Sequence, residues 1–439
     1  MDEKTEKQLL QWYEEIQTDE EALDTDGDLS DRPSEHNDYQ TDTEQSGNEE
    51  QSGNDLDDAM DDLQDVLDDG IPKFYGKDET PWYKQKPPEP KGKTKACNII
   101  TKLPGVKNAA KQAKTIMDCW KLFISDEMIK AIVKYTNQRL DLMRSSYQRP
   151  RDCPQIDYEE ILAFIGLLYM AGVKRGQHLN TGELWKSDGT APDFFAATMS
   201  KKRFHQLVQS IRFDDATKRL ETSAIDNLAP VRKTFQSFVT NCKGAYSSGF
   251  YVTIDEMLES FRGRFRFRQY IANKPAKYGI KIYALVDSRT FFTSNLEIYA
   301  GKQPEGPFQV KNDAASVVMR LIEPISKTGR NITTDNYFTS VPLAKTPVEK
   351  HRLTLIGTVR KNKPQIPREL LEVKGRPVKS SMFAYGKKPN NCLLVSYVPK
   401  PNKNVLLLST LHNDDKINEK TGEACKPEVI TDYNPTKGG

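Results

Sequence analysis

The first patterned part of the chain, from about residue 97 to residue 248, has apolar positions at helical spacing. Ser125 is a residue type that caps helices. After it, apolar side chains recur three or four positions apart, at Ile129, Ile132, Val133 and Leu140. This spacing predicts an amphipathic helix.

Further helices are predicted along the same part. Asp157 and Glu160 form a D-x-x-E start before a very apolar stretch, residues 161–170, which we expect to be a helix buried on most sides. Ser200 precedes another run, whose inward positions are Phe204, Leu207, Val208 and Ile211. The pattern therefore indicates a helical domain with a core of its own.

From Tyr251 onwards the pattern changes to strands. We predict strands at residues 251–258, 265–270, 280–287 and 291–299. Helices predicted at residues 314–325 and 341–350 then alternate with strands at 330–334 and 353–359. Strands first, followed by helix–strand alternation, is the order of a ribonuclease-H-like sheet, so the predicted fold class is α/β.

The same patterns divide the chain into six predicted parts. They are an acidic disordered tail (1–80), a basic proline-rich linker (81–96), the helical domain (97–248), an α/β core (249–361), an inserted mostly-β domain (362–427) and a return to the core (428–439). The insertion is predicted because proline is frequent there and only two short pieces resemble strands.

One segment alternates arginine with aromatic residues. Phe261, Gly263, Phe265 and Phe267 alternate with Arg262, Arg264, Arg266 and Arg268. In a strand the guanidinium groups would line one face, and guanidinium groups suit phosphate. With Lys274 and Lys277 of the following basic turn, these arginines are the predicted DNA-binding residues. A solvated strand face that discourages edge aggregation is the competing interpretation.

Charge is divided unevenly along the chain. The 439 residues carry a net charge of only +2, but the first 69 contain 26 of the 62 Asp and Glu and only 3 of the 64 Lys and Arg. The remainder is therefore strongly basic, which is the usual property of a protein that binds a polyanion. The acidic tail could shield that basic surface or could simply be solvated.

Composition also excludes several classes of protein. The six cysteines form no C-x-x-C pair and only five histidines are present, so we expect no zinc site and reduced thiols. The N-terminus is acidic and the longest apolar run has 13 residues, too few to span a bilayer. Reduced thiols fit a cytosolic or a nuclear protein; of the two we expect a nuclear protein, with no membrane partner and no small-molecule substrate.

Two carboxylates are candidates for catalysis. Asp255 lies within VTIDEML, and Asp335 lies where NITTDNYFTS passes from a strand to a polar turn. Carboxylates on neighbouring strands can hold two Mg²⁺ (or Mn²⁺) ions, which clamp the attacking and leaving oxygens of a phosphodiester. If these two aspartates converge, they could be catalytic residues and metal ligands, but spacing alone favours turn-forming roles for aspartates at strand ends. Glu256 should point to the opposite face and have a structural role.

Several blocks of the chain closely resemble piggyBac transposases, in family order. They are AFIGLLYMAGV, MSKKRFHQLVQSIRFDD, VTIDEMLESFRGRFRFRQYIANKPAKYGIKIYALVDS, NITTDNYFTSVPLAK, LIGTVRKNKPQIP, RPVKSSMFAY, LLVSYVPKP and YNPTKGG. The resemblance runs from about residue 118 to the last residue.

The resemblance implies a ribonuclease-H-like DDE/D core, flanked by a helical dimerisation and DNA-binding domain and interrupted by an insertion domain. It further implies a homodimer that excises and inserts DNA at TTAA sites with Mg²⁺. Asp255 matches the first catalytic aspartate and Asp335 the second, so we predict that the two converge as catalytic residues and metal ligands.

The third aspartate of the family follows its K-G-G motif by two residues, and that motif here is Lys437, Gly438 and Gly439. We therefore expect the 439-residue chain to have little or no strand-cleaving activity. The alternatives are a domesticated DNA- or chromatin-binding protein without catalysis, and a fragment or incomplete gene product.

Overall fold

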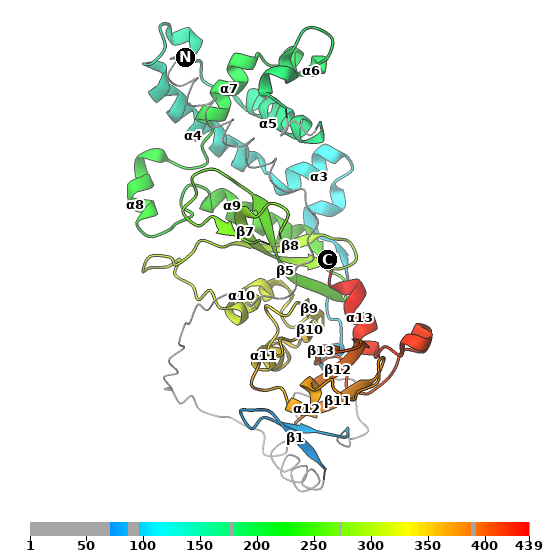
Figure 1. The fold of residues 1–439 in the computed structure, drawn as a ribbon. Coiled ribbons are helices and arrows are strands. Elements are labelled where there is room, and N and C mark those ends of the chain that lie inside the picture. The colour runs from blue at the N-terminus through cyan, green and yellow to red at the C-terminus, as the bar shows by residue number, and fades with distance from the viewer. Residues whose placement is uncertain (1–70, 87–95, 175–178, 273, 388–391, 439) are drawn as a thin grey trace. The chain divides into compact units, whose positions relative to one another are not determined.

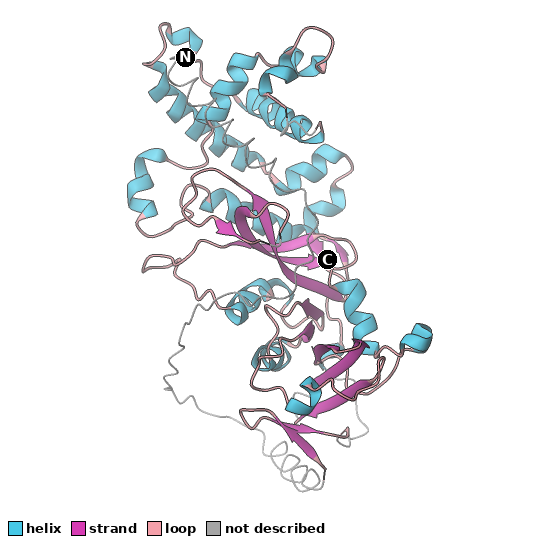
Figure 2. Cartoon of the chain, in the orientation of Figure 1, coloured by secondary structure: helices cyan, strands magenta, loops and turns pink. Residues whose placement is uncertain are grey.

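The computed structural model describes residues 71–86, 96–174, 179–272, 274–387 and 392–438. Most of the predicted acidic tail lies outside the described residues. In the described part, helices dominate as far as Ala245 and strands follow (Figures 1 and 2).

Seven α-helices lie in the described residues of the first half. They are α3 (Ile116–Phe123), α4 (Asp126–Arg144), α5 (Tyr158–Val173), α6 (Asp193–Thr198), α7 (Lys201–Ser210), α8 (Arg219–Ser223) and α9 (Arg232–Ala245). The predicted N-terminal residues begin these helices: Ser125 precedes α4, and the side chains of Asp157 and Ser200 accept backbone N–H groups of α5 and α7. Short 3-10 helices lie at Ala96–Asn98, Asn108–Gln112, Pro150–Asp152, Thr181–Trp185, Ala216–Lys218, Glu323–Ile325 and Glu419–Ala424.

The helical half has its own apolar core, as predicted. Ile129, Leu140, Phe164 and Leu207 are among the buried members of one cluster. The prediction that the apolar helix is buried on most sides was wrong. Only Ile161, Phe164 and Leu167 of α5 are buried, and its opposite side exposes Leu168, Tyr169 and Val173.

The second half forms one large mixed sheet. Its strand order is β1-β2-β11-β12-β13-β10-β9-β5-β7-β6, with β8 also paired to β7. Among the strands that the structure describes, only the neighbouring pairs β10–β9 and β9–β5 are parallel. The bounds are β1 (Lys73–Tyr75), β2 (Pro81–Tyr83), β5 (Tyr251–Ser260), β6 (Gln269–Tyr270), β7 (Tyr278–Asp287), β8 (Thr293–Ile298), β9 (Asn331–Thr334), β10 (Thr354–Thr358), β11 (Ser381–Gly386), β12 (Leu393–Lys400) and β13 (Lys403–Ser409). A second sheet pairs β3 (Gly105–Val106) with β4 (Tyr246–Ser247).

Helices cover both faces of the large sheet. α10 (Ala314–Leu321) and α11 (Val341–His351) pack with Val252, Ile254 and Ile332 in one buried cluster. α13 (Glu428–Thr436) packs with Ile356, Val395 and other residues of the opposite face. The short α12 (Arg368–Leu371) adds Leu370 to the first cluster. Because side chains alternate along a strand, the two sets belong to opposite faces.

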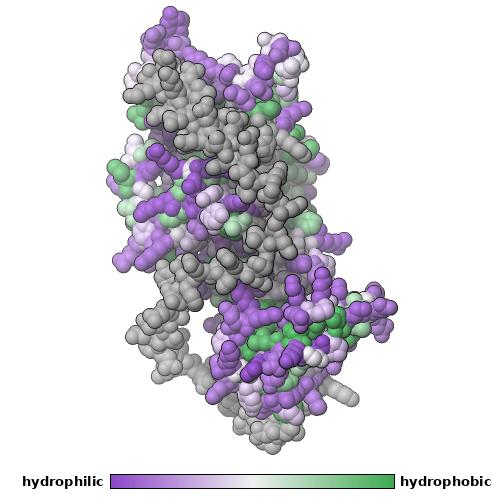
Figure 3. Space-filling model, in the orientation of Figure 1, coloured by the Kyte–Doolittle hydropathy of each residue, from purple (hydrophilic) through white to green (hydrophobic). Residues whose placement is uncertain are grey.

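The structure differs from the predicted insertion domain at residues 362–427. β11, β12 and β13 pair with one another, and β13 pairs with β10, so they continue the sheet of the core. Hydrophobic side chains gather over these strands on the face shown in Figure 3. Consecutive residues of β12 and most of β13 are buried, which fits a sheet covered on both faces.

The structure also corrects the end of the predicted tail and the start of the linker. β1 and β2 form a hairpin there, and β2 pairs with β11. The indole of Trp82 is 1% exposed, and its Nε1–H donates to the carbonyl of Gln365 at 2.8 Å. Aromatic burial thus orders a segment whose prolines and lysines suggested a linker.

Candidate active site

Asp255 and Asp335 lie side by side. β5 and β9 run parallel in the register Tyr251–Asn331 to Ile254–Thr334, so each aspartate is the next residue along its strand. The prediction that they converge on adjoining strands is confirmed. Their catalytic role stays a prediction.

Both aspartates belong to the α13 face of the sheet. Two positions earlier on each strand, Thr253 and Thr333 bond to Thr436 at the end of α13. The hydroxyl of Thr333 donates to the hydroxyl of Thr436 at 2.9 Å, and the hydroxyl of Thr253 donates to its carbonyl. Side chains two positions apart on a strand share a face, so the carboxylates of both aspartates lie on the face that the end of α13 covers.

In each of the two carboxylates, one oxygen accepts hydrogen bonds from the backbone. Oδ1 of Asp335 accepts the N–H groups of Tyr337 at 2.9 Å and Phe338 at 3.4 Å. Oδ1 of Asp255 accepts the N–H of Glu256 at 2.7 Å. The second oxygen of each carboxylate bonds to no residue in the described part of the chain. The pair therefore presents uncommitted, hard oxygen donors of the kind that Mg²⁺ and Mn²⁺ prefer.

Electrostatics at the pair favour a bound cation. Burial raises the pKa of Asp335, and the negative charge of Asp255 raises it further, whereas the backbone hydrogen bonds and Arg360 lower it. Two neighbouring carboxylates repel, and a divalent cation relieves that repulsion. The described residues contain no cluster of three or more His, Cys, Asp or Glu that could hold a metal.

Glu256 lies on the other face of β5, as predicted. It is opposite Tyr283 in the β5–β7 register, and its Oε1 lies 3.7 Å from the ammonium of Lys274. Its other oxygen is buried and has no hydrogen-bond partner among the residues that the structure describes. Burial raises the pKa of Glu256, and Asp255 and Asp335 add to the effect.

Two further cations lie near the turn after Asp335. The ammonium of Lys281 is 4.9 Å from the ring centroid of Tyr283 and 4.6 Å from that of Tyr337. The guanidinium of Arg360 is 5.8 Å from the Tyr337 ring and donates to Asn336 at 3.3 Å. Sequence reasoning missed these residues as site neighbours because nothing in their spacing links β7 to this turn.

The predicted arginine strand is corrected. Residues 261–268 do not pair as a strand, and β6 contains only Gln269 and Tyr270. Exposure nevertheless alternates as predicted: Arg262, Arg264, Arg266 and Arg268 are exposed, and the aromatic residues are half-buried. Phe261, Phe265 and Phe267 pack edge to face, at 6.1 and 5.6 Å between centroids. Ring packing, rather than a ladder of hydrogen bonds, keeps the arginines outward.

The two predicted lysines differ in their surroundings. Lys277 is exposed. The ammonium of Lys274 donates to the carbonyl of Glu256 at 3.1 Å and lies near its carboxylate. Lys274 therefore holds the turn against β5, beside the aspartates.

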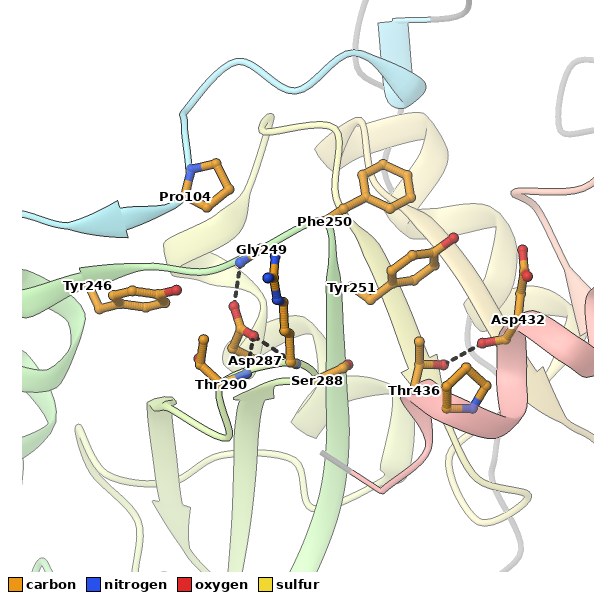
Figure 4. Close-up of a pocket in the computed structure, with 12 residues that line it drawn as sticks. Pro104, Tyr246, Gly249, Phe250, Tyr251, Asp287, Ser288, Thr290, Asp432 and Thr436 are labelled. Atoms are coloured by element: carbon orange, nitrogen blue, oxygen red, sulfur yellow. Dashed lines mark hydrogen bonds between the residues drawn. The ribbon is translucent and has the colours of Figure 1, made fainter.

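A cavity of about 740 Å³ lies at the other end of β5 (Figure 4). Tyr246, Phe250 and Tyr251 line it together with the turn after β7 and the end of α13. Asp287, at its wall, accepts the N–H groups of Gly249, Arg289 and Thr290. That carboxylate is fully used by the backbone, and the cavity does not include the Asp255–Asp335 pair.

No helix within the described residues is both long and apolar enough to cross a membrane.

Comparison with known proteins agrees with this arrangement. A family model described as Transposase IS4 matches residues 115–439. The chain is similar to a solved structure of a piggyBac transposase synaptic complex with hairpin DNA, with 39% sequence identity and a TM-score of 0.71. That match covers 77% of this chain and 69% of the solved one.

Two human proteins are similar at lower identity. They are PiggyBac transposable element-derived protein 3 and the chimeric ERCC6-PGBD3 protein, each 23% identical over 261 residues. The matches cover 57% of this chain but only 40% and 22% of the two human proteins. The chain therefore spans less than half the length of either.

Proposed function

Since this chain belongs to the piggyBac transposase family of DDE transposases, we propose that its core descends from an enzyme of metal-dependent DNA strand cleavage and transfer at TTAA sites, and that it supplies two of the metal-binding aspartates and a DNA-binding surface for that reaction. The observation that carries the proposal is the parallel register that brings Asp255 beside Asp335. The ions would be Mg²⁺ or Mn²⁺, and the cellular location would be the nucleus.

The sheet supports a ribonuclease-H-like core. The strands β8, β7 and β5 follow one another antiparallel, and β9 and β10 then lie parallel to β5. The crossovers carry α10 and α11, which pack on one face. In such a sheet, the carboxyl ends of neighbouring parallel strands bring side chains from distant sequence positions together.

In this proposal the two aspartates hold and orient the cations. Bound divalent ions would stabilise charge on the transferring phosphate and activate the attacking oxygen. The backbone N–H groups of Glu256 and Tyr337 fix one oxygen of each carboxylate, which leaves the other for the ion. Lys281 and Arg360 keep positive charge on the neighbouring turn, where a DNA backbone would approach.

DNA would contact the exposed guanidinium groups of residues 261–268, and Lys277 of the following turn. The alternating exposure of the segment supports this, since all four arginines face solvent. The solved structure similar to this chain is itself a complex with DNA. The apolar side of α5 that remains exposed supports pairing of two copies.

Metal binding tests the proposal directly. The 439-residue chain should bind Mn²⁺, measured by electron paramagnetic resonance of the free ion, and Asp255→Asn and Asp335→Asn should each abolish most of the binding. Asp188→Asn is the matched control, because Asp188 is an exposed turn residue that accepts from Thr190.

The opposite result would favour a DNA-binding protein without metal chemistry. In that case the wild-type chain would bind duplex DNA equally well with Mn²⁺ or a chelator, and neither aspartate variant would change Mn²⁺ binding. Equal Mn²⁺ affinity in all four proteins would exclude the acidic pair as the metal site.

A further inference from the structure

Arg330, the residue before β9, carries a deeply buried charge. Its side chain is 1% exposed and ranks among the largest fully buried ones. No carboxylate in the described ranges forms an ion pair with it. Burial lowers the pKa of Arg330 and the charge of Asp287 partly offsets this, but a buried guanidinium without a direct ion pair is costly unless hydrogen bonds satisfy it, so its acceptors define its role.

Those acceptors lie mainly in the segment that leads into β5. Nε donates to the carbonyls of Ser248 at 3.0 Å and Gly249 at 2.9 Å. Nη2 donates to the Ser248 carbonyl at 2.5 Å and to the hydroxyl of Ser247 at 3.1 Å. The N–H of Gly249 donates in turn to Asp287 (Figure 4), so this segment is held from two sides.

The same guanidinium also binds the segment around Lys102, in addition to the segment that leads into β5. Nη2 also donates to the carbonyl of Lys102 at 2.9 Å. The adjacent Thr101 donates through its N–H to Thr328 and through its hydroxyl to Lys327. Gly329 has a φ of +72°, and a Cβ there would meet the carbonyl of Ile99 at 2.0 Å. The chain before β3 is thus packed closely against Arg330.

These contacts lie where the parallel pairing begins. The N–H of Asn331 donates to the carbonyl of Phe250 at 2.9 Å, and Tyr251 and Asn331 are the first register pair. Four positions further along both strands are Asp255 and Asp335. A slip of one residue would turn one aspartate to the opposite face, so the alignment of the strands fixes the geometry of the pair.

We propose that Arg330 is a positioning residue for the acidic pair: by binding the chain that enters β5, it sets the alignment of β5 with β9 and so the spacing of the two carboxylates. This rests on the proposed metal site. Arginine suits the role because its planar fork reaches several carbonyls at once, whereas the single ammonium of lysine cannot reproduce that set.

The test compares Mn²⁺ affinity with stability in folded variants. Arg330→Lys should weaken Mn²⁺ binding about tenfold or more, as is typical for residues that orient metal ligands. Ser247→Ala, which removes one acceptor, should cause a smaller loss in the same direction. Arg320→Lys is the matched control: its guanidinium grips Glu297 at 2.6 and 2.8 Å but contacts neither β5 nor β9. It should lower Tm and leave Mn²⁺ affinity unchanged.

Wild-type affinity in folded Arg330→Lys would overturn the inference, as would losses of affinity that simply follow the losses of Tm in all three variants. If Arg330→Lys does not fold, unchanged affinity in Ser247→Ala has the same meaning.

A wild-type chain that binds no Mn²⁺ at the pair would refute the metal site instead. Hydrogen exchange of the Asn331 amide then tests whether Arg330 aligns β5 with β9. Faster exchange in the Arg330→Lys or Ser247→Ala variant supports that role, and an unchanged rate contradicts it.

Discussion

Asp335 illustrates a conflict between folding and function at a single residue. Its pKa is raised by burial and by Asp255, so the folded chain holds a proton on it more tightly than the unfolded chain does. The resulting stabilisation is complete below the ordinary pKa of 3.8 and is lost as the pH rises through the raised value. Without metal at neutral pH, the charged carboxylate therefore works against the fold.

We predict that Asp335→Asn raises the Tm of the metal-free protein at pH 7, since asparagine removes the charge and keeps the acceptor for Tyr337. The gain should shrink towards pH 4, and added Mn²⁺ should no longer raise Tm. Thermal melts with and without chelator measure both effects.

Asp188→Asn provides the contrast, because hydrogen bonds from Thr190 lower the pKa of Asp188. That variant should not gain stability at pH 7. A lower Tm for metal-free Asp335→Asn than for wild type would contradict the explanation.

Individual residues also show the limits of sequence reasoning. Asp255 and Asp335 could be predicted because each follows an apolar strand run and lies in a block that resembles one family. Arg330 and Lys281 could not be predicted, because their roles depend on partners distant in the chain. Arg330 bonds Lys102, 228 positions away, and no local pattern specifies such a contact.

Among the elements, α13 lies on the same face of the sheet as the acidic pair and links β5 and β9 to the end of β13. Its last turn is held by the hydroxyls of Thr253 and Thr333. Nearer its middle, His412 Nε2 lies 3.0 Å from a carboxylate oxygen of Asp432, and His412 Nδ1 lies 2.9 Å from the hydroxyl of Ser409. These polar contacts bind the helix to β5, β9 and the end of β13 and set its position relative to the aspartates.

Thr436→Val should destabilise the protein by about 1–3 kcal/mol, because it leaves the buried hydroxyl of Thr333 without its acceptor. Urea unfolding measures the change. Thr240→Val on α9 is the control, since the hydroxyl of Thr240 is exposed and bonds only within its own helix. Equal effects of the two substitutions would show that Thr436 does not anchor α13.

The prediction of helices and strands succeeded where buried apolar residues recur at a regular helical or strand spacing. The helices of the first half and the strands β5, β7, β9 and β10 follow their apolar spacing. It failed at residues 261–268, where alternation arises from stacked rings without strand pairing. It also missed β1 and β2, whose partner β11 lies about three hundred positions later.

At the scale of the whole molecule, charge is the dominant property. Beyond residue 69 the chain holds 61 of the 64 Lys and Arg but only 36 of the 62 Asp and Glu. Such a surface attracts polyanions through counterion release, and affinity then falls steeply with salt.

We predict that replacing Arg264 and Arg266 together by alanine reduces the slope of log K against log salt for duplex DNA by about 2, at roughly 0.9 per phosphate contact. Fluorescence anisotropy over a range of salt measures it. The control replaces Lys400 and Lys403, which are exposed at the β12–β13 turn. Equal slopes in the two double variants would assign the effect to net charge rather than to this segment.

The hairpin of β1 and β2 has a consequence for handling the protein. In the described sheet, β11 lies between β12 and β2. Removal of β2 would therefore expose the edge of β11 at Tyr385 and Gly386, and exposed strand edges recruit other chains into aggregates. A shortened chain that lacks the acidic residues should therefore begin before Lys73, so that β2 and its buried Trp82 still cover the edge of β11.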